Sequence, residues 1–282
     1  MGRNVIRRKP LEPRSPSEAD HEARDGGVQS VDRALSILET LAEDDAGYRL
    51  SDLAVRTGLS ASTVHRLLAT LESRRFVQFD RTESKWHVGA RAFTVGATFA
   101  RRRNFSAQAV PYLRKLRDLT RETANLAVVD DEFIVVLTRA ESREIMRSLT
   151  QVGGRVAMVA SGVGKAVLAT WSDDDVNAII HRQGMPRLTE KSIVRPSDLF
   201  KELETIRRQG FAVDDEEARI GLRCIAAVVF NDCGEPLAAI SVSGMTSRVT
   251  EERVPALGRA VSEVAAELTV ALGGVMPAAK VS

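Results

Sequence analysis

The chain has 282 residues, enough for two ordinary domains, and its 44% hydrophobic and 28% charged residues are typical of a soluble globular protein. No apolar run approaches the roughly 18 to 20 residues of a membrane-spanning helix, and the N-terminus lacks the apolar core of a secretory signal. The sequence therefore predicts a cytoplasmic protein without a membrane partner. Two cysteines and four scattered histidines argue against a metal site, and no other pattern calls for a cofactor.

The net charge of +2 conceals an uneven distribution. Residues 56–104 hold ten basic residues against three acidic ones, whereas residues 105–282 are mildly acidic. Such an asymmetry indicates that one part of the chain faces nucleic acid and another part does something else. Residues 1–27 mix Pro, Ser, Glu and Arg with few large apolar side chains, which predicts a disordered N-terminal extension.

Three helices are predicted next. They are expected at 30–43, 51–57 and 61–74. Ser30 is a plausible N-cap of the first helix, and Ser60 of the third, because a serine hydroxyl accepts from a free backbone N–H at a helix start. Gly58 separates the second and third helices and can adopt a left-handed turn without steric cost.

A β-hairpin is predicted after the third helix. Alternating polar and apolar residues at 76–80 and 85–88 flank the polar tetrapeptide 81–84. Three helices with a short glycine turn, followed by a hairpin, form a winged helix-turn-helix. The sequence therefore predicts a DNA-binding domain over residues 28–89.

A helical linker is predicted over 90–122, in two pieces joined near 101–104. From residue 123 to 274 strands alternate with helices. Strands are expected on both sides of Asp130-Asp131 and at 145–152, 210–214, 222–230 and 235–243, and helices at 161–171, 173–182, 197–209 and 251–272. This order predicts an α+β protein whose second domain is an α/β, GAF-like sensor.

The third helix carries the candidate DNA-reading side chains. Ser62 and Arg66 lie opposite its apolar stripe, and short hydroxyls and arginine can contact phosphates and base edges. The DNA-binding candidates are Ser60, Ser62, Thr63, His65, Arg66, Arg74, Arg81 and Lys85. Any one of them could instead belong to a solvated surface, and His65 could equally lie at the edge of the core.

The stretch VASGVGKAVLA, which begins at Val159, looks at first like a phosphate loop. A Walker pattern needs Gly at position 159 and Ser or Thr at 166, where this chain has Val159 and Ala166. A dinucleotide fingerprint needs Gly at position 167, where this chain has Val167. What remains is a glycine turn that begins a helix and offers free N–H groups to an anion.

Small polar residues recur near the end of the chain. Ser241 and Ser243 share one face of a strand, and Cys224 could lie on the paired strand. With Asp214 they would suit a small, oxygen-rich ligand. The spacing alone favours a structural interpretation, because strand serines often lie at an edge and a single cysteine is most often a buried small hydrophobe.

The sequence argues against an enzyme. A cysteine hydrolase needs a base near Cys224, and the only histidine of the second domain is His181, on a polar predicted helix. The adjacent acids Asp214-Asp215 and Glu216-Glu217 fit a solvated surface better than a catalytic pair. A cysteine-dependent enzyme acting on a small acid is the less favoured alternative.

The sequence resembles the IclR family of bacterial transcriptional regulators over roughly residues 28–272. The resemblance is carried by VQSVDRALSILETLAEDDAGYRLSDLAVRTGLSASTVHRLLATLESRRFV in the first domain and by ASGVGKAVLA and DDEEARIGLRCIAAVVFNDCGEPLAAISVSG in the second. It implies a regulator that binds double-stranded operator DNA as a homodimer or homotetramer. A ligand would act by biasing the helices of the linker.

The resemblance also implies an effector site. In this family a small carboxylate takes backbone N–H groups at the glycine turn, and an Asp, a Cys and two Ser complete the pocket. The implied effector-binding residues are Gly162, Val163, Asp214, Cys224, Ser241 and Ser243. Val163 stands where alanine is frequent, so a short 2-oxo acid such as glyoxylate or pyruvate is expected, with aromatic acids as the alternative. Candidate apolar walls are Ile145, Met146, Met158 and Leu222.

Overall fold

The computed structural model describes residues 28–102, 105–142 and 151–277. The chain forms two compact units, Met1–Phe99 and Ala100–Ser282, so that helix α5 (Ala90–Arg102) contains the division between them. The predicted N-terminal extension lies outside the described residues. Within these described ranges no helix is both long enough and apolar enough to cross a membrane.

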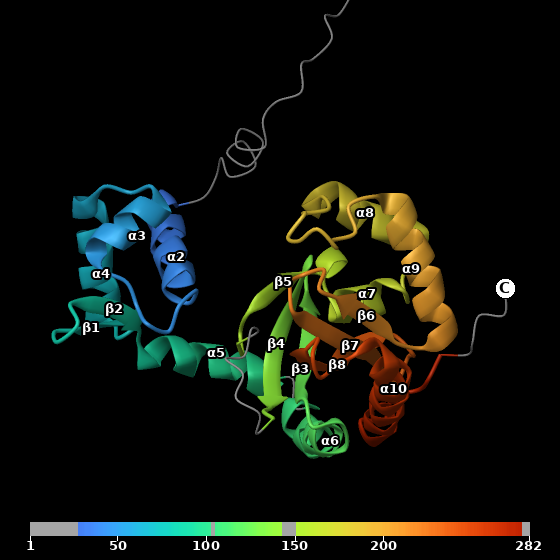
Figure 1. The fold of residues 1–282 in the computed structure, drawn as a ribbon. Coiled ribbons are helices and arrows are strands. Elements are labelled where there is room, and N and C mark those ends of the chain that lie inside the picture. The colour runs from blue at the N-terminus through green and yellow to red at the C-terminus, as the bar shows by residue number, and fades with distance from the viewer. Residues whose placement is uncertain (1–27, 103–104, 143–150, 278–282) are drawn as a thin grey trace, which may run out of the picture. The chain divides into compact units, whose positions relative to one another are not determined.

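The first unit is the predicted winged helix-turn-helix (Figure 1). It contains α2 (Gln29–Leu41), α3 (Leu50–Thr57), α4 (Ala61–Ser73), β1 (Val77–Asp80) and β2 (Lys85–Val88). The two strands pair antiparallel as the predicted hairpin. The apolar sides of the three helices and the hairpin bury a small core of Ile37, Leu41, Leu53, Val64, Leu68, Val77 and Trp86.

Two of the three expected capping residues are confirmed. Gly58 ends α3 in the left-handed region with φ of +66°, and the Ser60 Oγ accepts a hydrogen bond from the Thr63 N–H at 3.2 Å at the start of α4. The prediction for Ser30 is wrong, because α2 begins one residue earlier. Val28 occupies the N-cap position, and its side chain has no oxygen with which to accept from the first turn.

The two predicted linker helices are present as α5 and α6 (Phe105–Thr120). One side of α6 is buried through Ala109, Leu113 and Leu116. Helix α6 therefore belongs to the core of the second unit.

The second unit is built on a six-stranded antiparallel sheet with the order β5-β4-β3-β8-β7-β6. Its strands are β3 (Thr123–Asp130), β4 (Phe133–Ala140), β5 (Arg155–Ala157), β6 (Ala212–Asp215), β7 (Leu222–Phe230) and β8 (Pro236–Met245). Most of the strand expected at 145–152 lies outside the described residues, and residues 151 and 152 are not in a strand. The first strand of this unit, β3, pairs with its last strand, β8, in the middle of the sheet.

Helices cover both faces of this sheet (Figure 1). On one face α6 and α10 (Val254–Ala271) pack against alternate residues such as Leu126 and Ile240. On the other face α7 (Gly162–Leu168), α8 (Asp173–Gln183) and α9 (Pro196–Gln209) share a core that includes Ala127 and Ala226. Because side chains along a strand alternate between the two faces, each strand contributes to both cores.

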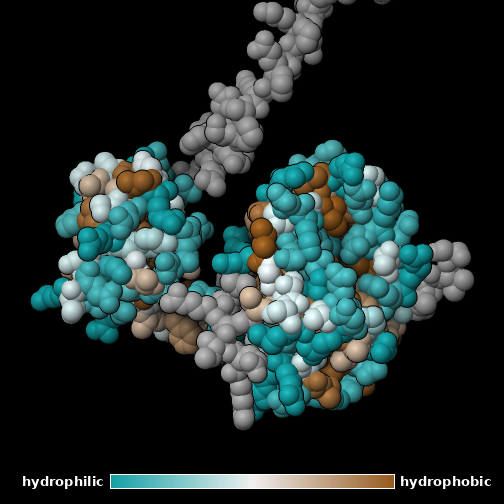
Figure 2. Space-filling model, in the orientation of Figure 1, coloured by the Kyte–Doolittle hydropathy of each residue, from teal (hydrophilic) through white to brown (hydrophobic). Residues whose placement is uncertain are grey.

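The outer surface of both units is mainly polar. On the face of the molecule shown in Figure 2, hydrophilic residues dominate the surface of each unit, and the hydrophobic residues are scattered among them. The order of helices and strands makes the chain a mixed α+β protein, as the predicted elements indicated.

Candidate functional site

The second unit contains a cavity of about 240 Å³ between the sheet and α7. Its lining includes all six residues predicted for the effector site: Gly162, Val163, Asp214, Cys224, Ser241 and Ser243. The described lining also contains Asn125, Ala127, Ile134, Val136, Val156, Ser161, Leu188, Ala218, Arg219 and Leu222. The structure thus brings the six predicted residues together, although they are spread over more than 80 positions of the sequence.

The strand register explains why the polar residues converge. Asp214 on β6 lies opposite Cys224 on β7, and Cys224 lies opposite Ser243 on β8. Ser241, two residues before Ser243 and therefore on the same face, lies opposite Asn125 on β3. Four adjacent strands therefore present one patch of small polar side chains to the cavity.

The start of α7 forms the opposite wall of the cavity. The Ser161 Oγ caps this helix by accepting from the Gly164 N–H at 3.0 Å. The N–H groups of Gly162 and Val163 have no hydrogen-bond partner within the described part of the chain. A Cβ on Gly162 would lie 3.3 Å from the Cys224 carbonyl oxygen, so the glycine allows the helix start to approach the sheet closely.

Asp214 is buried, and its pKa is raised above the ordinary value for an aspartate. Burial raises the pKa of this carboxyl, and the positive charge of Lys165 opposes that rise. The Oδ1 atom accepts from the N–H groups of Glu217 at 2.8 Å and Ala218 at 3.3 Å. These bonds fix the carboxyl at the edge of the cavity.

Cys224 is a neutral thiol. Burial, with a smaller contribution from the Asp214 charge, raises the pKa of Cys224 to about 11. The thiolate that a nucleophilic cysteine requires is therefore disfavoured at neutral pH. His181 is exposed on α8 and does not line the cavity, and none of the described lining residues is a histidine. The site thus lacks the activated cysteine of a hydrolase.

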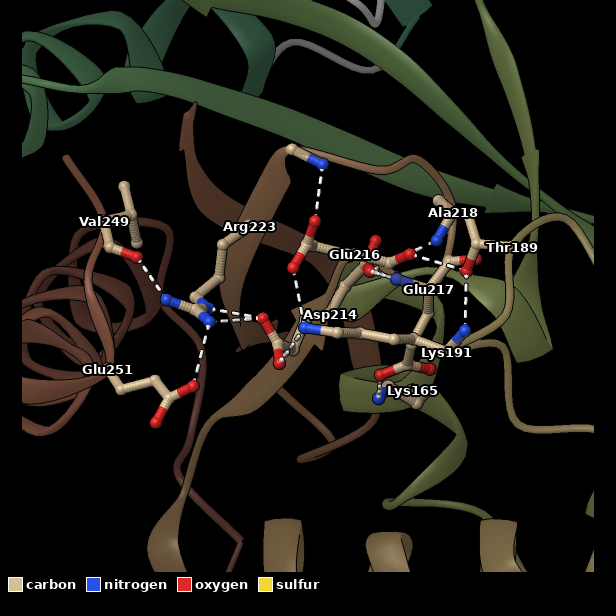
Figure 3. Close-up of polar contacts among 12 residues, drawn as sticks. Lys165, Thr189, Lys191, Asp214, Glu216, Glu217, Ala218, Arg223, Val249 and Glu251 are labelled. Carbon is tan, nitrogen blue, oxygen red and sulfur yellow. Dashed lines mark hydrogen bonds and ion pairs between the residues drawn. The ribbon is translucent and has the colours of Figure 1, made fainter. Parts of the chain in front are cut away.

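Lys165 forms a buried ion pair with the segment that follows β6 (Figure 3). Its side chain is fully buried, and its Nζ lies 2.5 Å from Oε1 of Glu217 and 3.3 Å from Oε1 of Glu202 on α9. The lysine of the apparent phosphate loop is therefore committed to a buried ion pair. Because the backbone of Glu217 holds Asp214, this pair also positions the carboxyl of the site.

The segment between β6 and β7 is held at further points (Figure 3). The Lys191 Nζ donates to Glu216 Oε1 at 2.6 Å and to Asp215 Oδ2 at 3.2 Å. The Arg223 Nε donates to Asp215 Oδ1 at 2.7 Å. The interpretation of the adjacent acids as a solvated surface is wrong for Asp214 and Glu217. Both are buried, because Asp214 lines the cavity and Glu217 pairs with Lys165.

The apolar walls follow the predictions only in part. Leu222 lines the cavity, whereas Met158 is buried in the core and is absent from the lining. Ile145 and Met146 lie outside the described residues. The sequence reasoning missed Asn125, whose only signal was a polar residue inside an otherwise apolar strand.

The first unit presents the predicted DNA-facing residues around α4. Ser62 and Arg66 are exposed, and Ser62 joins Ser60 and Thr63 in a cluster of hydroxyls, with Oγ to Oγ of 3.0 Å between the two serines. A hollow of about 530 Å³ between α4 and the hairpin is lined in part by His65 and Arg81.

The other two predicted DNA contacts, Arg74 and Lys85, differ in whether an ion pair already holds the side chain. Arg74 is exposed at the end of α4, whereas the Lys85 Nζ lies 3.2 Å from Oε2 of Glu83 in an ion pair within the hairpin. Lys85 would have to leave or share this pair in order to contact a phosphate, while Arg74 would not.

Two protein-family models together match most of the chain. Residues 30–81 match the IclR helix-turn-helix domain, and residues 97–270 match the C-terminal domain of the bacterial transcriptional regulator IclR. The chain is 41% identical over 263 residues to the transcriptional repressor IclR of Escherichia coli K12, covering 93% of this chain and 96% of that protein. It is also 41% identical over 251 residues to the acetate operon repressor of Salmonella typhimurium, covering 88% and 92%.

A solved structure shows the same fold. The IclR transcriptional regulator from Alicyclobacillus acidocaldarius superposes with a TM-score of 0.73 at 26% identity, covering 88% of this chain and 100% of that chain.

Proposed function

This chain belongs to the IclR family of bacterial transcriptional regulators, and we propose that a short carboxylic acid bound in its cavity controls its binding to operator DNA. The expected ligand is glyoxylate or a similar short 2-oxo acid. A regulator of bacterial transcription acts in the cytoplasm, where the chromosome lies.

The convergence of the six predicted residues on one cavity carries this proposal. Free N–H groups of Gly162 and Val163 on one wall suit a carboxylate, and the small polar groups on the sheet suit the polar substituent next to it. The cavity volume of about 240 Å³ is below the roughly 300 to 1,000 Å³ of most small-molecule pockets. This size suits a small acid and not a drug-sized ligand.

DNA binding is assigned to α4 and the hairpin of the first unit. Arg66 is exposed on α4 and can bond a guanine edge with two donors. Arg74 and Arg81 would contact phosphates, which position a protein on DNA without reading its sequence. Such contacts make affinity fall steeply with salt, and a flat salt dependence would contradict this assignment.

The ligand would act through the assembly. We expect a homodimer or a homotetramer in which helices α5 and α6 connect the two kinds of unit. A ligand shifts an equilibrium only as far as its affinities for the two arrangements differ. Binding in the cavity must therefore change the preferred arrangement of these helices.

Titration calorimetry of the full chain tests the proposal. Glyoxylate and pyruvate should bind, 4-hydroxybenzoate should bind more weakly, and Asp214→Ala and Cys224→Ser should each weaken the binding of the short acids. Both variants should bind operator DNA normally without ligand, because their changes lie in the second unit. Unchanged affinity in both variants would remove the cavity as the ligand site.

A further inference from the structure

The proposed ligand is an anion, and the cavity that would bind it contains a buried acid. Only two side chains of the described lining carry a charge, Asp214 and Arg219. Arg219 is exposed, so water screens its charge, whereas only 3% of Asp214 is exposed. A carboxylate that enters this cavity therefore meets the charge of Asp214 with little compensation from the lining.

Asp214 lies directly beside the start of α7, where the ligand's carboxylate is expected. A Cβ on Gly162 would lie 3.4 Å from the backbone nitrogen of Asp214 and 3.5 Å from its Cβ. The N–H of Gly162 is one of the two groups proposed to bind the ligand. Two carboxyl groups would thus share one small cavity, and such a pair holds a proton more tightly than either group alone.

The nearest buried cluster adds further negative charge. Lys165 pairs with Glu217 and Glu202, and its positive charge is also felt by Asp214 (Figure 3). Three carboxyl groups therefore share one ammonium before any ligand arrives. Lys165 cannot neutralise a fourth carboxylate as well.

The other titratable groups around Asp214 do not supply the missing charge. On its own strand Asp215 is paired with Arg223 and Lys191, so those two cations already have a partner. On the neighbouring strand Cys224 lies opposite Asp214 and is a neutral thiol. A proton from the solvent is the remaining source of positive charge.

The two oxygens of Asp214 are used differently. Oδ1 accepts from the backbone N–H groups of Glu217 at 2.8 Å and Ala218 at 3.3 Å. Oδ2 has no hydrogen-bond partner among the described residues, and it is not one of their fully buried atoms without a partner, so it keeps accessible surface. A proton on this carboxyl belongs on Oδ2, from which it can be donated to an oxygen of the ligand.

We propose that Asp214 takes up a proton from the solvent when the acid binds and donates it from Oδ2 to the ligand in a hydrogen bond. One anion and one proton then enter the cavity together, so the charge of the site does not change and the regulator binds the acid more tightly as the pH falls. This inference rests on the proposed function and adds a form of regulation to the same site. Burial already raises the pKa of Asp214 in the empty cavity, so the ligand has to raise it less.

Calorimetry of the full chain with glyoxylate and with pyruvate tests the proposal. Titrations at one pH in buffers of different ionisation enthalpy count the protons taken up with each ligand. The carboxyl groups of both acids stay ionised from pH 6 to pH 9, so the uptake reports on the protein. Wild type should take up most of one proton at some pH in this range.

The affinity should follow the same linkage. The pKa of Asp214 is higher in the complex than in the empty protein, so full affinity is present below the lower of the two values. It is lost as the pH rises from that value to the higher one, with a Kd that increases by up to about tenfold for each pH unit.

Asp214→Asn is the decisive variant. Its amide oxygen can accept from the same two backbone N–H groups, which places the NH₂ group where Oδ2 lies. This amide donates without taking up a proton, so the variant should bind both acids without uptake and with a Kd constant within about twofold from pH 6 to pH 9. Glu202→Gln is the matched control, because it makes the same change on a partner of Lys165 outside the described lining and should retain the uptake.

The outcomes separate the two proposals. A wild-type Kd that is constant over this range without proton uptake overturns the role of Asp214 and leaves the proposed regulator intact. Uptake that persists in Asp214→Asn, or that disappears in Glu202→Gln, places the proton elsewhere and also overturns it. Wild type that binds neither acid at any pH overturns both proposals. Thermal unfolding and ligand-free operator binding verify the fold of each variant, and if Asp214→Asn does not fold, the uptake by wild type and by Glu202→Gln decides.

Discussion

Replacing Lys165 by methionine should destabilise the second unit strongly. The substitution keeps the length and apolar stem of the side chain but removes the ammonium that neutralises Glu217 and Glu202. Glu217 is only 7% exposed, and its Oε2 already has no hydrogen-bond partner in the described structure. The variant therefore leaves a buried carboxylate without its lysine counter-ion.

The size of the effect follows from that burial. Breaking a buried ion pair by removing one partner costs about 3–5 kcal/mol, because the remaining charge is desolvated without compensation. For a unit of this length each kcal/mol lowers the Tm by about 2–4 °C, so Lys165→Met should lower it by roughly 10 °C. The double variant Lys165→Met/Glu217→Leu removes the stranded charge and should recover more than half of the loss.

The loss should also depend on pH. Burial raises the pKa of Glu217 and Lys165 holds that rise back, so removing Lys165 raises the pKa further. A folded-state pKa above the unfolded value means that the folded protein binds the proton more tightly. Stability is therefore retained below the ordinary glutamate pKa and is lost as the pH rises through the folded value. The deficit of Lys165→Met should be smaller at pH 5 than at pH 8.

Scanning calorimetry of wild type, Lys165→Met and the double variant measures these differences. A loss below about 1 kcal/mol in the single variant would show that solvent reaches Glu217 and would refute the reasoning. A double variant less stable than the single one would mean that Glu217 stabilises the unit independently of Lys165. A deficit that does not change between pH 5 and pH 8 would exclude Glu217 as its cause.

Three further results are expected. Arg66→Ala should weaken operator binding by about 1–3 kcal/mol while affecting a scrambled duplex less, and equal losses in filter binding would reduce Arg66 to a phosphate contact. Ser60→Ala should cost the first unit about 1 kcal/mol in chemical unfolding, because it removes the cap of α4, and an unchanged midpoint would deny the cap that role. In the native protein a thiol reagent should modify the exposed Cys233 but not Cys224, because burial and a pKa of about 11 keep the Cys224 thiolate rare. Mass spectrometry counts the labelled cysteines, and rapid labelling of both would contradict the buried position of Cys224.

Local sequence signals predicted the first unit well. The glycine turn at Gly58, the cap at Ser60 and the alternating hairpin each depend on residues only a few positions apart, and the structure confirms all three. The same kind of reasoning failed at Ser30, where the helix starts one residue earlier than the side-chain preference suggested. Helix ends are set by packing as well as by capping, which a local pattern does not contain.

In the second unit, contacts between distant parts of the sequence could not be predicted from local patterns. Cys224 and Ser241 belong to strands joined by a short turn, so their proximity was predictable from spacing. Asn125 lies 116 positions from Ser241, and only the pairing of the first strand with the last brings them together. The ion pairs of Lys165 were equally unpredictable, because its partners come from α9 and from the segment after β6. Nothing within a window of neighbouring residues records such contacts.

The pairing of β3 with β8 also has a consequence during synthesis of the protein. A ribosome completes Asn125 long before Ser241 and Ser243, so a nascent chain carries one side of the ligand patch without the other. Contacts between distant segments form late, since a long loop must close first. The helices of the first unit depend on nearby residues and can fold while the rest is still being made. A partly synthesised chain can therefore hold a folded first unit before the proposed ligand site exists, because that site needs β8 as well as β3.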